Sequence, residues 1–290
     1  MTHGAARHVT VRDATHEDLA RIAEITVATG QDEEWAGSNP DYVRHLMRHG
    51  QVVVAECAGE VAGFGAVLVI GTGPSAISML CDLFVDPSMH GRGWGRAILA
   101  ELWRDQPRRM TFSSLHANAV PLYTSFGLDA WWPLLYLYGG AGSVAMPDGW
   151  SVEQVTPDEA GQAEQAWTGT DRTEDHRAWS RRPNGVSATA SYAGELMAVG
   201  TFGGHVQDFG ITHLAISPAA DDEAAASAVL AAIAGVVPPG DLARVTLPAP
   251  HPAVRSLLPA GWRFDEFDLF MATDPSLLDP RRAVPSPGQA

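Results

Sequence analysis

The stretch from Leu83 to Leu102, LFVDPSMHGRGWGRAILAEL, limits the possible folds of this chain more than any other. It begins inside an apolar run, Met79 to Val85, that is typical of a buried strand. Pro87 ends this strand because proline cannot donate a ladder hydrogen bond. Beyond the turn HGRGWG, apolar residues recur with helical spacing from Ala97 to Trp103. The stretch therefore predicts a strand, a glycine-rich turn and a helix in direct succession.

This arrangement is suited to bind a phosphate. The first N–H groups of a helix have no partner within the helix, and the helix dipole favours negative charge at that end. Glycines at 91, 93 and 95 let the amides approach a ligand closely, and Arg92 and Arg96 add positive charge. The spacing G-x-G-x-G fits neither a Walker loop nor the dinucleotide fingerprint G-x-G-x-x-G. The alternative interpretation is a tight strand-to-helix turn without a ligand.

Composition narrows the class of protein. The 290 residues suggest about two domains. The chain has 34 acidic residues and 19 basic ones, and its net charge of −15 argues against nucleic acid or an anionic membrane as a partner. The two cysteines, Cys57 and Cys81, provide no disulfide framework. No apolar run reaches membrane length and the N-terminus lacks a signal-peptide core, so we expect a cytoplasmic protein.

Further elements follow from periodicity and turn residues. His45 and His49 have the i, i+4 spacing of helical metal ligands, but no third ligand is evident nearby, so we expect no metal. The remaining expected elements are a strand and helix over 9–25 with a helix start at Thr15 to Asp18, a helical region over 31–50, a hairpin over 51–70 that turns at Ala58 to Glu60, a strand over 110–115, and a short helix over 116–128 that ends at Gly127.

The glycine turn resembles the pyrophosphate loop of the GNAT superfamily of acyl-CoA N-acyltransferases. That loop reads Gln/Arg-x-x-Gly-x-Gly/Ala after a strand that ends in Val-x-Pro. Gly93 and Gly95 match this pattern, whereas His90 stands at its first position. The resemblance implies that the turn binds the pyrophosphate of an acyl-CoA, usually acetyl-CoA.

A second segment, 116–128, resembles the family pattern Asn-x-x-Ala-x-x-Leu-Tyr-x-x-x-Gly-Phe. The matching residues are Ala119, Leu122, Tyr123 and Gly127, while His116 replaces the usual Asn and Leu128 the usual Phe. The resemblance implies that Tyr123 protonates the departing thiolate; the alternative is a half-buried helix aromatic. The residues expected to bind acetyl-CoA are Leu83, Phe84, Val85, His90, Gly91, Arg92, Gly93, Trp94, Gly95, Arg96 and His116.

The general base cannot be carried over from the family. A strand glutamate found in some members falls on Met79, which cannot titrate. Asp82 is kept as a candidate catalytic residue, although it has the opposite strand parity, and Cys81 shares the parity of Met79. Glu33, His116 or a water relay stay open as alternatives.

The second half of the sequence resembles a degenerate repeat of the first, which predicts a structural repeat. The pairs are Ala58 to Val61 with Ala193 to Leu196, Leu83 to Pro87 with Leu214 to Pro218, Leu122 to Gly127 with Ser256 to Gly261, and Thr15 to Asp18 with Thr156 to Glu159. We therefore expect an α/β (α+β) fold of two tandem GNAT-like domains, each a mixed, largely antiparallel twisted sheet flanked by helices. The expected ranges are a catalytic domain over 1–140, a linker over 141–149, a degenerate domain over 150–275 and a flexible tail over 276–290.

The copy lacks the chemistry of the first domain. Asp221, Asp222 and Glu223 stand where the first domain has its glycine turn, and Leu257 replaces Tyr123. Acidic residues repel a pyrophosphate, so the second domain is interpreted as a structural lid or a dimer element. A separate binding role for it stays open, as does the choice between a monomer and a homodimer.

The acceptor prediction depends on the acidic segment Asp32 to Trp35, which in a GNAT-like fold borders the acceptor pocket. An acidic mouth that includes Glu33 favours a small cationic amine, and Trp35 could add a cation–π contact to that amine. The alternative is a solvated acidic loop. The predicted function is acetyl-CoA-dependent N-acetylation of a small amine, without a metal. A non-catalytic acyl-CoA-binding or sensing module and a purely structural tandem domain remain alternatives.

Overall fold

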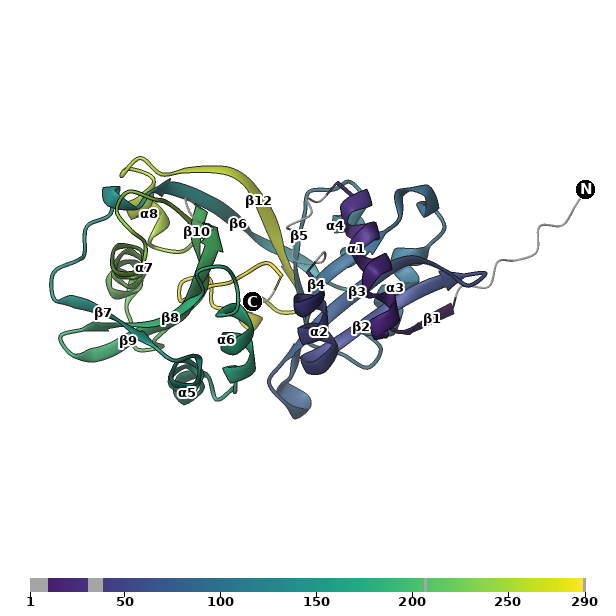
Figure 1. Ribbon diagram of the computed structural model, residues 1–290, viewed down its shortest axis with the longest axis horizontal. Helices are drawn as coiled ribbons and strands as arrows, with labels where there is room; N and C mark the ends of the chain where they lie inside the picture. The colour runs from purple at the N-terminus through teal and green to yellow at the C-terminus, as the bar shows by residue number, and fades with distance from the viewer. Residues whose placement is uncertain (1–9, 31–38, 206–207, 289–290) are drawn as a thin grey trace, which may run out of the picture. The chain divides into compact units, whose positions relative to one another are not determined.

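The computed structural model describes residues 10–30, 39–205 and 208–288, which form two compact units (Figure 1). The first unit ends at Thr111, and the second runs from Phe112 to Gly288. The division lies inside β5 (Arg109–Ser113), so the expected domain boundary after residue 140 needs correction. The boundary differs because of β6 (Asp129–Gly140). This strand pairs with β11 (Leu242–Pro248) and β12 (Arg263–Ala272), so it belongs to the second unit.

The first unit is a mixed, largely antiparallel sheet, as predicted. Its strands lie in the order β1-β2-β3-β4-β5; the first four form antiparallel pairs, and β4 pairs with β5 in parallel. The elements not yet defined are β1 (Thr10–Asp13), α1 (Leu19–Ala28), α2 (Pro40–His49), β2 (Gly50–Cys57), β3 (Glu60–Ile70), β4 (Ile77–Val85) and α3 (Trp94–Leu102), with 3₁₀ turns at His16–Asp18, Gly73–Ser75 and Pro87–Met89.

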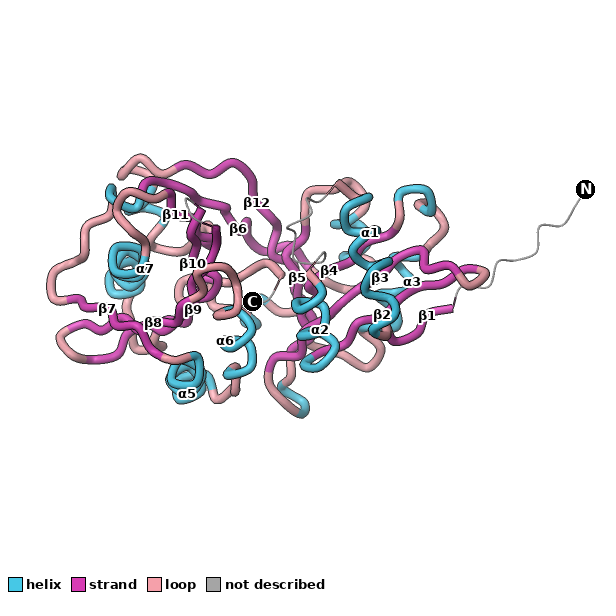
Figure 2. Tube along the Cα trace, viewed as in Figure 1, coloured by secondary structure: helices cyan, strands magenta, loops and turns pink. Residues whose placement is uncertain are grey.

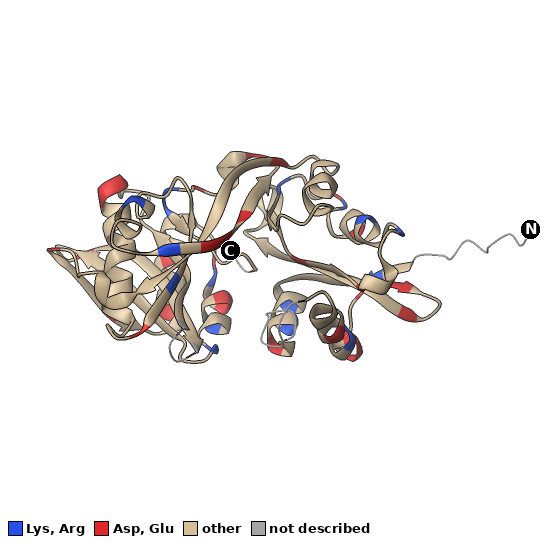
Figure 3. Ribbon diagram, turned by 90° about the horizontal axis from the view of Figure 1, so that it is seen from above, with Lys and Arg blue, Asp and Glu red and all other residues tan. Residues whose placement is uncertain are grey.

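Helices cover both faces of this sheet (Figure 3). On one face, Ile22 of α1 and Leu46 of α2 join a buried cluster with Val52, Val54 and Phe64 of the strands. On the other face α3 packs so closely that a Cβ on Gly65 would lie 2.5 Å from Ile98. The glycine turn is thereby attached to a helix that the core holds in place.

The second unit repeats this plan with more strands (Figure 2). Its strand order is β12-β6-β11-β10-β9-β8-β7, and β13 also pairs with β10. One face packs against α7, whereas α5 and α6 lie against β8 and β9. The further elements are α4 (Ala119–Thr124), β7 (Trp150–Val155), α5 (Pro157–Thr168), α6 (Thr173–Trp179), β8 (Val186–Tyr192), β9 (Glu195–His205), β10 (Asp208–Ile216), α7 (Asp222–Val236), α8 (Val254–Leu257) and β13 (Ala283–Val284), with 3₁₀ turns at Ala141–Ser143 and Pro275–Leu277.

The strand register confirms the internal repeat. In the β3–β4 pair the register shifts between Leu80 and Asp82, so Cys81 is a bulged residue. In the β9–β10 pair it shifts between Ile211 and His213, so Thr212 occupies the corresponding place. Both units also start a helical segment with a capping box, at Thr15 and at Thr156.

Two segments expected to be loose are ordered. Within 141–149, expected as a linker, Ala141 is buried and its N–H donates to the Asp241 carbonyl at 3.0 Å. The expected flexible tail, 276–290, is wrong for the described residues up to 288, because β13 pairs with β10 through Leu214 and Ala215. A strand of two residues in a proline-rich sequence leaves no periodic signal, so the sequence alone could not reveal it.

Candidate active site

The turn between β4 and α3 begins with a carboxylate that fixes the chain. Asp86 accepts hydrogen bonds from the backbone N–H and the hydroxyl of Ser88, at 2.9 and 2.7 Å. Arg21 of α1 bonds its other carboxylate oxygen at 2.6 Å. The hydrogen bonds from Ser88 and Arg21 hold the pKa of Asp86 below its usual range. Asp86 is therefore a charged anchor that sets where the glycine turn starts.

The glycine turn itself leaves its helix start open. Gly91 and Gly93 have φ of 76° and 83°, a left-handed conformation that other residues rarely adopt. A Cβ at either glycine would have no heavy atom within 4 Å among its described surroundings, so both face open space. Gly93 is the N-cap of α3, and no described side chain caps this helix. The first amides of α3 are therefore available to an anion, which is the fit that an acyl-CoA pyrophosphate requires.

The other expected cofactor residues of the first unit surround this turn with different roles. His90 directs Nε2 to the Val85 carbonyl at 2.8 Å, so its ring braces the strand end. Arg92 and Arg96 are exposed, whereas the Trp94 side chain is buried and can offer only its backbone. Leu83, Phe84 and Val85 are half-buried at the end of β4.

The sheet opens beside these residues. β4 pairs with β5 only from Ser78 to Leu80, and in the described part of the chain the rest of β4 pairs with β3 alone. The bulge at Cys81 lies where the parallel pairing stops. Backbone groups from Leu83 to Val85 can thus hydrogen-bond a ligand that lies along this edge.

The bulge also explains a residue pair that sequence reasoning missed. An extra residue in a strand reverses the facing of those that follow, so the parity argument against Asp82 is wrong. The Asp82 side chain is buried, at 5% exposure, and accepts a 2.9 Å hydrogen bond from the Tyr42 hydroxyl of α2. No sequence signal links Tyr42 to Asp82, because the contact depends on how α2 packs on the sheet.

The remaining expected residues belong to other segments of the chain. Tyr123 is buried on α4 of the second unit, and His116 is exposed before that helix, where Nδ1 accepts from the Asn118 N–H at 3.3 Å. The acceptor residues Glu33 and Trp35 lie outside the described residues. His45 and His49 lie on α2 with ring centroids 4.7 Å apart.

In the second unit, the helix start and the strand edge that correspond to those of α3 and β4 are already occupied by other parts of the chain. Asp221 caps α7 by accepting from the Ala224 N–H at 2.9 Å, so a carboxylate already occupies the helix start. The edge of β10 that corresponds to Leu83 and Phe84 of β4 is paired with β13. These two contacts fill the places that an acyl-CoA would need.

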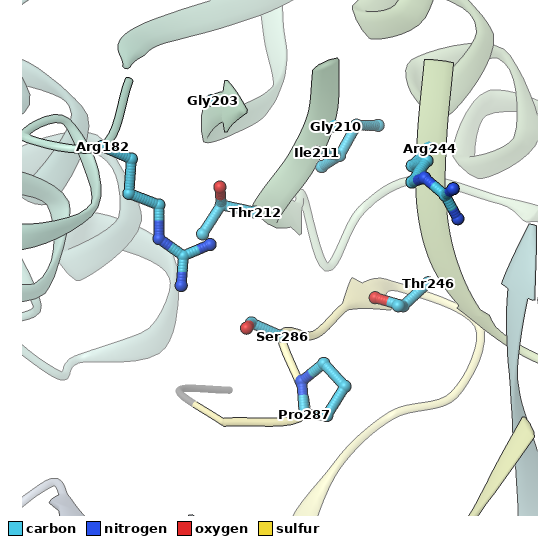
Figure 4. A pocket seen from close by; sticks show the side chains of 9 residues that line it. All are labelled: Arg182, Gly203, Gly210, Ile211, Thr212, Arg244, Thr246, Ser286 and Pro287. Carbon is cyan, nitrogen blue, oxygen red and sulfur yellow. The ribbon is translucent and has the colours of Figure 1, made fainter. Parts of the chain in front are cut away.

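A cavity of about 210 Å³ remains beside β13 in the second unit (Figure 4). Arg182 extends toward the space between Thr212, the bulged residue of β10, and Ser286. The other lining residues are Gly203, Gly210, Ile211, Arg244, Thr246 and Pro287. Because the C-terminal segment forms part of its wall, this cavity is not an open counterpart of the edge of β4.

Among the described helices, none is long and apolar enough to cross a membrane.

Comparison with known proteins agrees with this geometry. Residues 48–127 match the family model described as an acetyltransferase (GNAT) domain. No curated protein matches the sequence. A Pyrococcus horikoshii protein assigned as an acetyltransferase has a similar structure, with a TM-score of 0.72, 14% identity and 100% of each chain covered.

Two further solved structures are similar. A tandem GNAT protein from the clavulanic acid biosynthesis pathway has a TM-score of 0.61 at 15% identity, covering 91% of this chain and 98% of its own. A GCN5-related N-acetyltransferase from Anabaena variabilis has a TM-score of 0.61 at 16% identity, covering 91% and 72%. The family-model match covers residues 48–127, and these structures show that the chain has a fold of two tandem GNAT-like units.

Proposed function

We propose that the chain is an acetyl-CoA-dependent N-acetyltransferase that acetylates the amine of a small molecule. The observation that carries this proposal is the start of α3 at Gly93, which no described side chain caps, beside the edge of β4 that no described strand pairs beyond Leu80. Amides of Gly91 to Arg96 would bind the pyrophosphate, and the β4 edge would hold the pantetheine arm. Bound acetyl-CoA supplies the activated acyl group.

The proposed reaction moves two protons, one from the attacking amine and one to the departing sulfur. Backbone groups at Leu83 to Val85 would polarise the carbonyl of a bound thioester. Tyr123, whose role follows from its motif, would donate a proton to the sulfur that leaves as the amine takes the acetyl group. Asp82 is the candidate that accepts the proton of the attacking amine, because it is a buried carboxylate on the same strand as the cofactor edge.

The same features support one acyl-CoA per chain. Asp221 and β13 occupy the equivalent places in the second unit, so the proposal gives this unit no acyl-CoA site of its own. Calorimetric titration with CoA is expected to give a stoichiometry of one. Two CoA molecules per chain would contradict this assignment.

The proposed acceptor is a small cationic amine. The motive is the acidic segment around Glu33 and Trp35 in a chain of net charge −15, because one sign of charge concentrates ligands of the other. Raising the ionic strength, or replacing Glu33 and Glu34 by Gln, is expected to weaken the apparent acceptor affinity. A best acceptor that is neutral or anionic would contradict it.

The deciding experiment is a panel of amines incubated with acetyl-CoA and read by release of free thiol. Amine-dependent thiol release supports the transferase. CoA binding without release from any amine favours the alternative, a non-catalytic acyl-CoA-binding or sensing module. Failure to bind CoA would leave a structural tandem protein.

A further inference from the structure

Three metal-capable side chains meet inside the second unit, away from the features described above. Glu164 comes from α5, His176 from α6 and His213 from β10, and they are 3%, 0% and 6% exposed. Their ligand atoms all lie within 4.8 Å of one another. His176 Nε2 is 2.8 Å from a Glu164 carboxylate oxygen, and His213 Nε2 lies 3.1 and 3.2 Å from the two oxygens.

The surroundings orient both imidazoles toward the carboxylate. The Thr201 hydroxyl lies 2.8 Å from His176 Nδ1, which leaves Nε2 directed at the cluster. The ring of Trp179 stacks on His213 at 4.7 Å and 30°. Metal-binding histidines are characteristically held by a hydrogen bond at the other ring nitrogen, as His176 is, whereas packing alone holds His213 among the described residues. The rings are thus positioned before any ligand arrives.

The charged groups nearest the cluster are Arg172 and Asp175. Arg172 is bonded to Asp175 at 2.9 Å, and its positive charge also acts on Glu164. Glu164 has the two imidazoles as its hydrogen-bonding partners in the described residues. A buried carboxylate is stable only when its charge is balanced, by a proton on a neighbour or by a metal.

We propose that Glu164, His176 and His213 form a binding site for a divalent transition-metal ion, with Zn²⁺ as the best match. Two imidazoles and one carboxylate are a frequent zinc ligand set, and a solvent molecule completes the fourth position. Because the three ligands come from α5, α6 and β10, the ion ties both helices to the sheet. This ligand set with an open position is typical of catalytic zinc, but all three side chains are buried here, so the proposed role of the ion is structural. The proposal departs from the expectation of a protein without a metal.

The experiment uses the full chain and three readouts. Purified protein is analysed for bound metal, stripped with a chelator, and titrated with Zn²⁺ while its thermal unfolding is followed. We expect one equivalent of Zn²⁺ per chain and a rise in Tm of several degrees, because the ion binds the folded state only. Co²⁺ added to the stripped protein is expected to give the visible absorption of a four-coordinate site.

A matched pair of variants separates this site from adventitious binding. His213→Gln is expected to lose the Co²⁺ absorption and the Zn²⁺-dependent Tm rise. His251→Gln, which alters another buried histidine of the same unit, is expected to keep both. Wild-type protein that shows neither a bound equivalent nor a Co²⁺ spectrum would overturn the proposal, and the cluster would then be a hydrogen-bonded triad alone. An equal loss in both variants would also overturn it.

Discussion

Tyr42 and Asp82 are joined by a 2.9 Å hydrogen bond between the phenol hydroxyl and the carboxylate, with both side chains buried. The bond links α2 to the strand that carries the proposed cofactor edge. The hydrogen bond stabilises the buried carboxylate of Asp82, the residue after the bulge. Without a partner, burial of this carboxylate would carry a large desolvation cost. Asp82 is thus the titratable strand residue best placed to act in the proposed reaction.

Asp82→Asn is expected to lower kcat by about a hundredfold while leaving the CoA dissociation constant unchanged, because the amide cannot accept a proton. Steady-state kinetics with the best amine and CoA titration give the two quantities. Tyr42→Phe, which removes only the hydrogen bond, should have a smaller effect on kcat. Wild-type turnover in Asp82→Asn would assign the carboxylate to packing.

Gly93→Val is expected to abolish CoA binding, because a β-branched residue does not tolerate the φ of 83° at the start of α3. The matched control is Gly59→Val, at a hairpin turn of the same unit with φ of 82° and open surroundings. Both variants carry a similar backbone strain, so calorimetry should separate them by CoA binding and not by stability. Retained affinity in Gly93→Val would remove the loop from the proposed site.

Tyr123→Phe is expected to reduce turnover by about a hundredfold with little change in CoA affinity, since it deletes the proton donor and keeps the ring. Tyr192→Phe, at an exposed tyrosine of the same unit, serves as the control and should have the wild-type rate. A similar rate in Tyr123→Phe would mean that another group protonates the thiolate.

Burial lowers the pKa of His251 from 6.5 to about 4, despite the opposing charges of Asp279 and Asp222. The unfolded state therefore takes up a proton at higher pH than the folded state does. The stability that the neutral ring permits is complete above pH 6.5 and is lost as the pH falls toward 4, by about 3 kcal/mol. Urea unfolding at several pH values is expected to show a shallower pH slope in His251→Gln than in wild type or His16→Gln, and burial of His213 leaves part of the slope in all three.

Removal of residues 282–290 is expected to destabilise the second unit and to promote self-association. The deletion removes β13 and exposes the edge of β10 at Leu214 and Ala215, and an exposed edge pairs with other chains. Thermal unfolding and light scattering report the two effects. Removal of 289–290 alone leaves β13 in place and should behave as the longer chain does. An unchanged oligomeric state and Tm after the longer deletion would contradict the prediction.

The sequence was informative where structure is decided locally. Pro87 ended the strand and the glycines defined the turn, so β4, the turn and α3 could be predicted within a few residues. The bulge at Cys81 could not, because it exists only in the register between β3 and β4. The same holds for Glu164, His176 and His213, which have no regular spacing and meet only through packing.

The boundary of the units was missed for a similar reason. A strand is assigned to a unit by its partners, and β6 pairs with β11 and β12, which lie far beyond it in the sequence. The motif around Tyr123 matched the family pattern without showing on which unit that residue packs. Local patterns therefore identified the elements but not the assembly of the sheet.

The order of β10 and β13 along the chain has a consequence during protein synthesis. Between them lie α7, β11, α8 and β12, so the edge of β10 at Leu214 and Ala215 stays bare until all four have been made. A bare edge can pair with a strand of another chain. The nascent second unit is therefore open to wrong strand pairing for as long as the ribosome takes to add these elements.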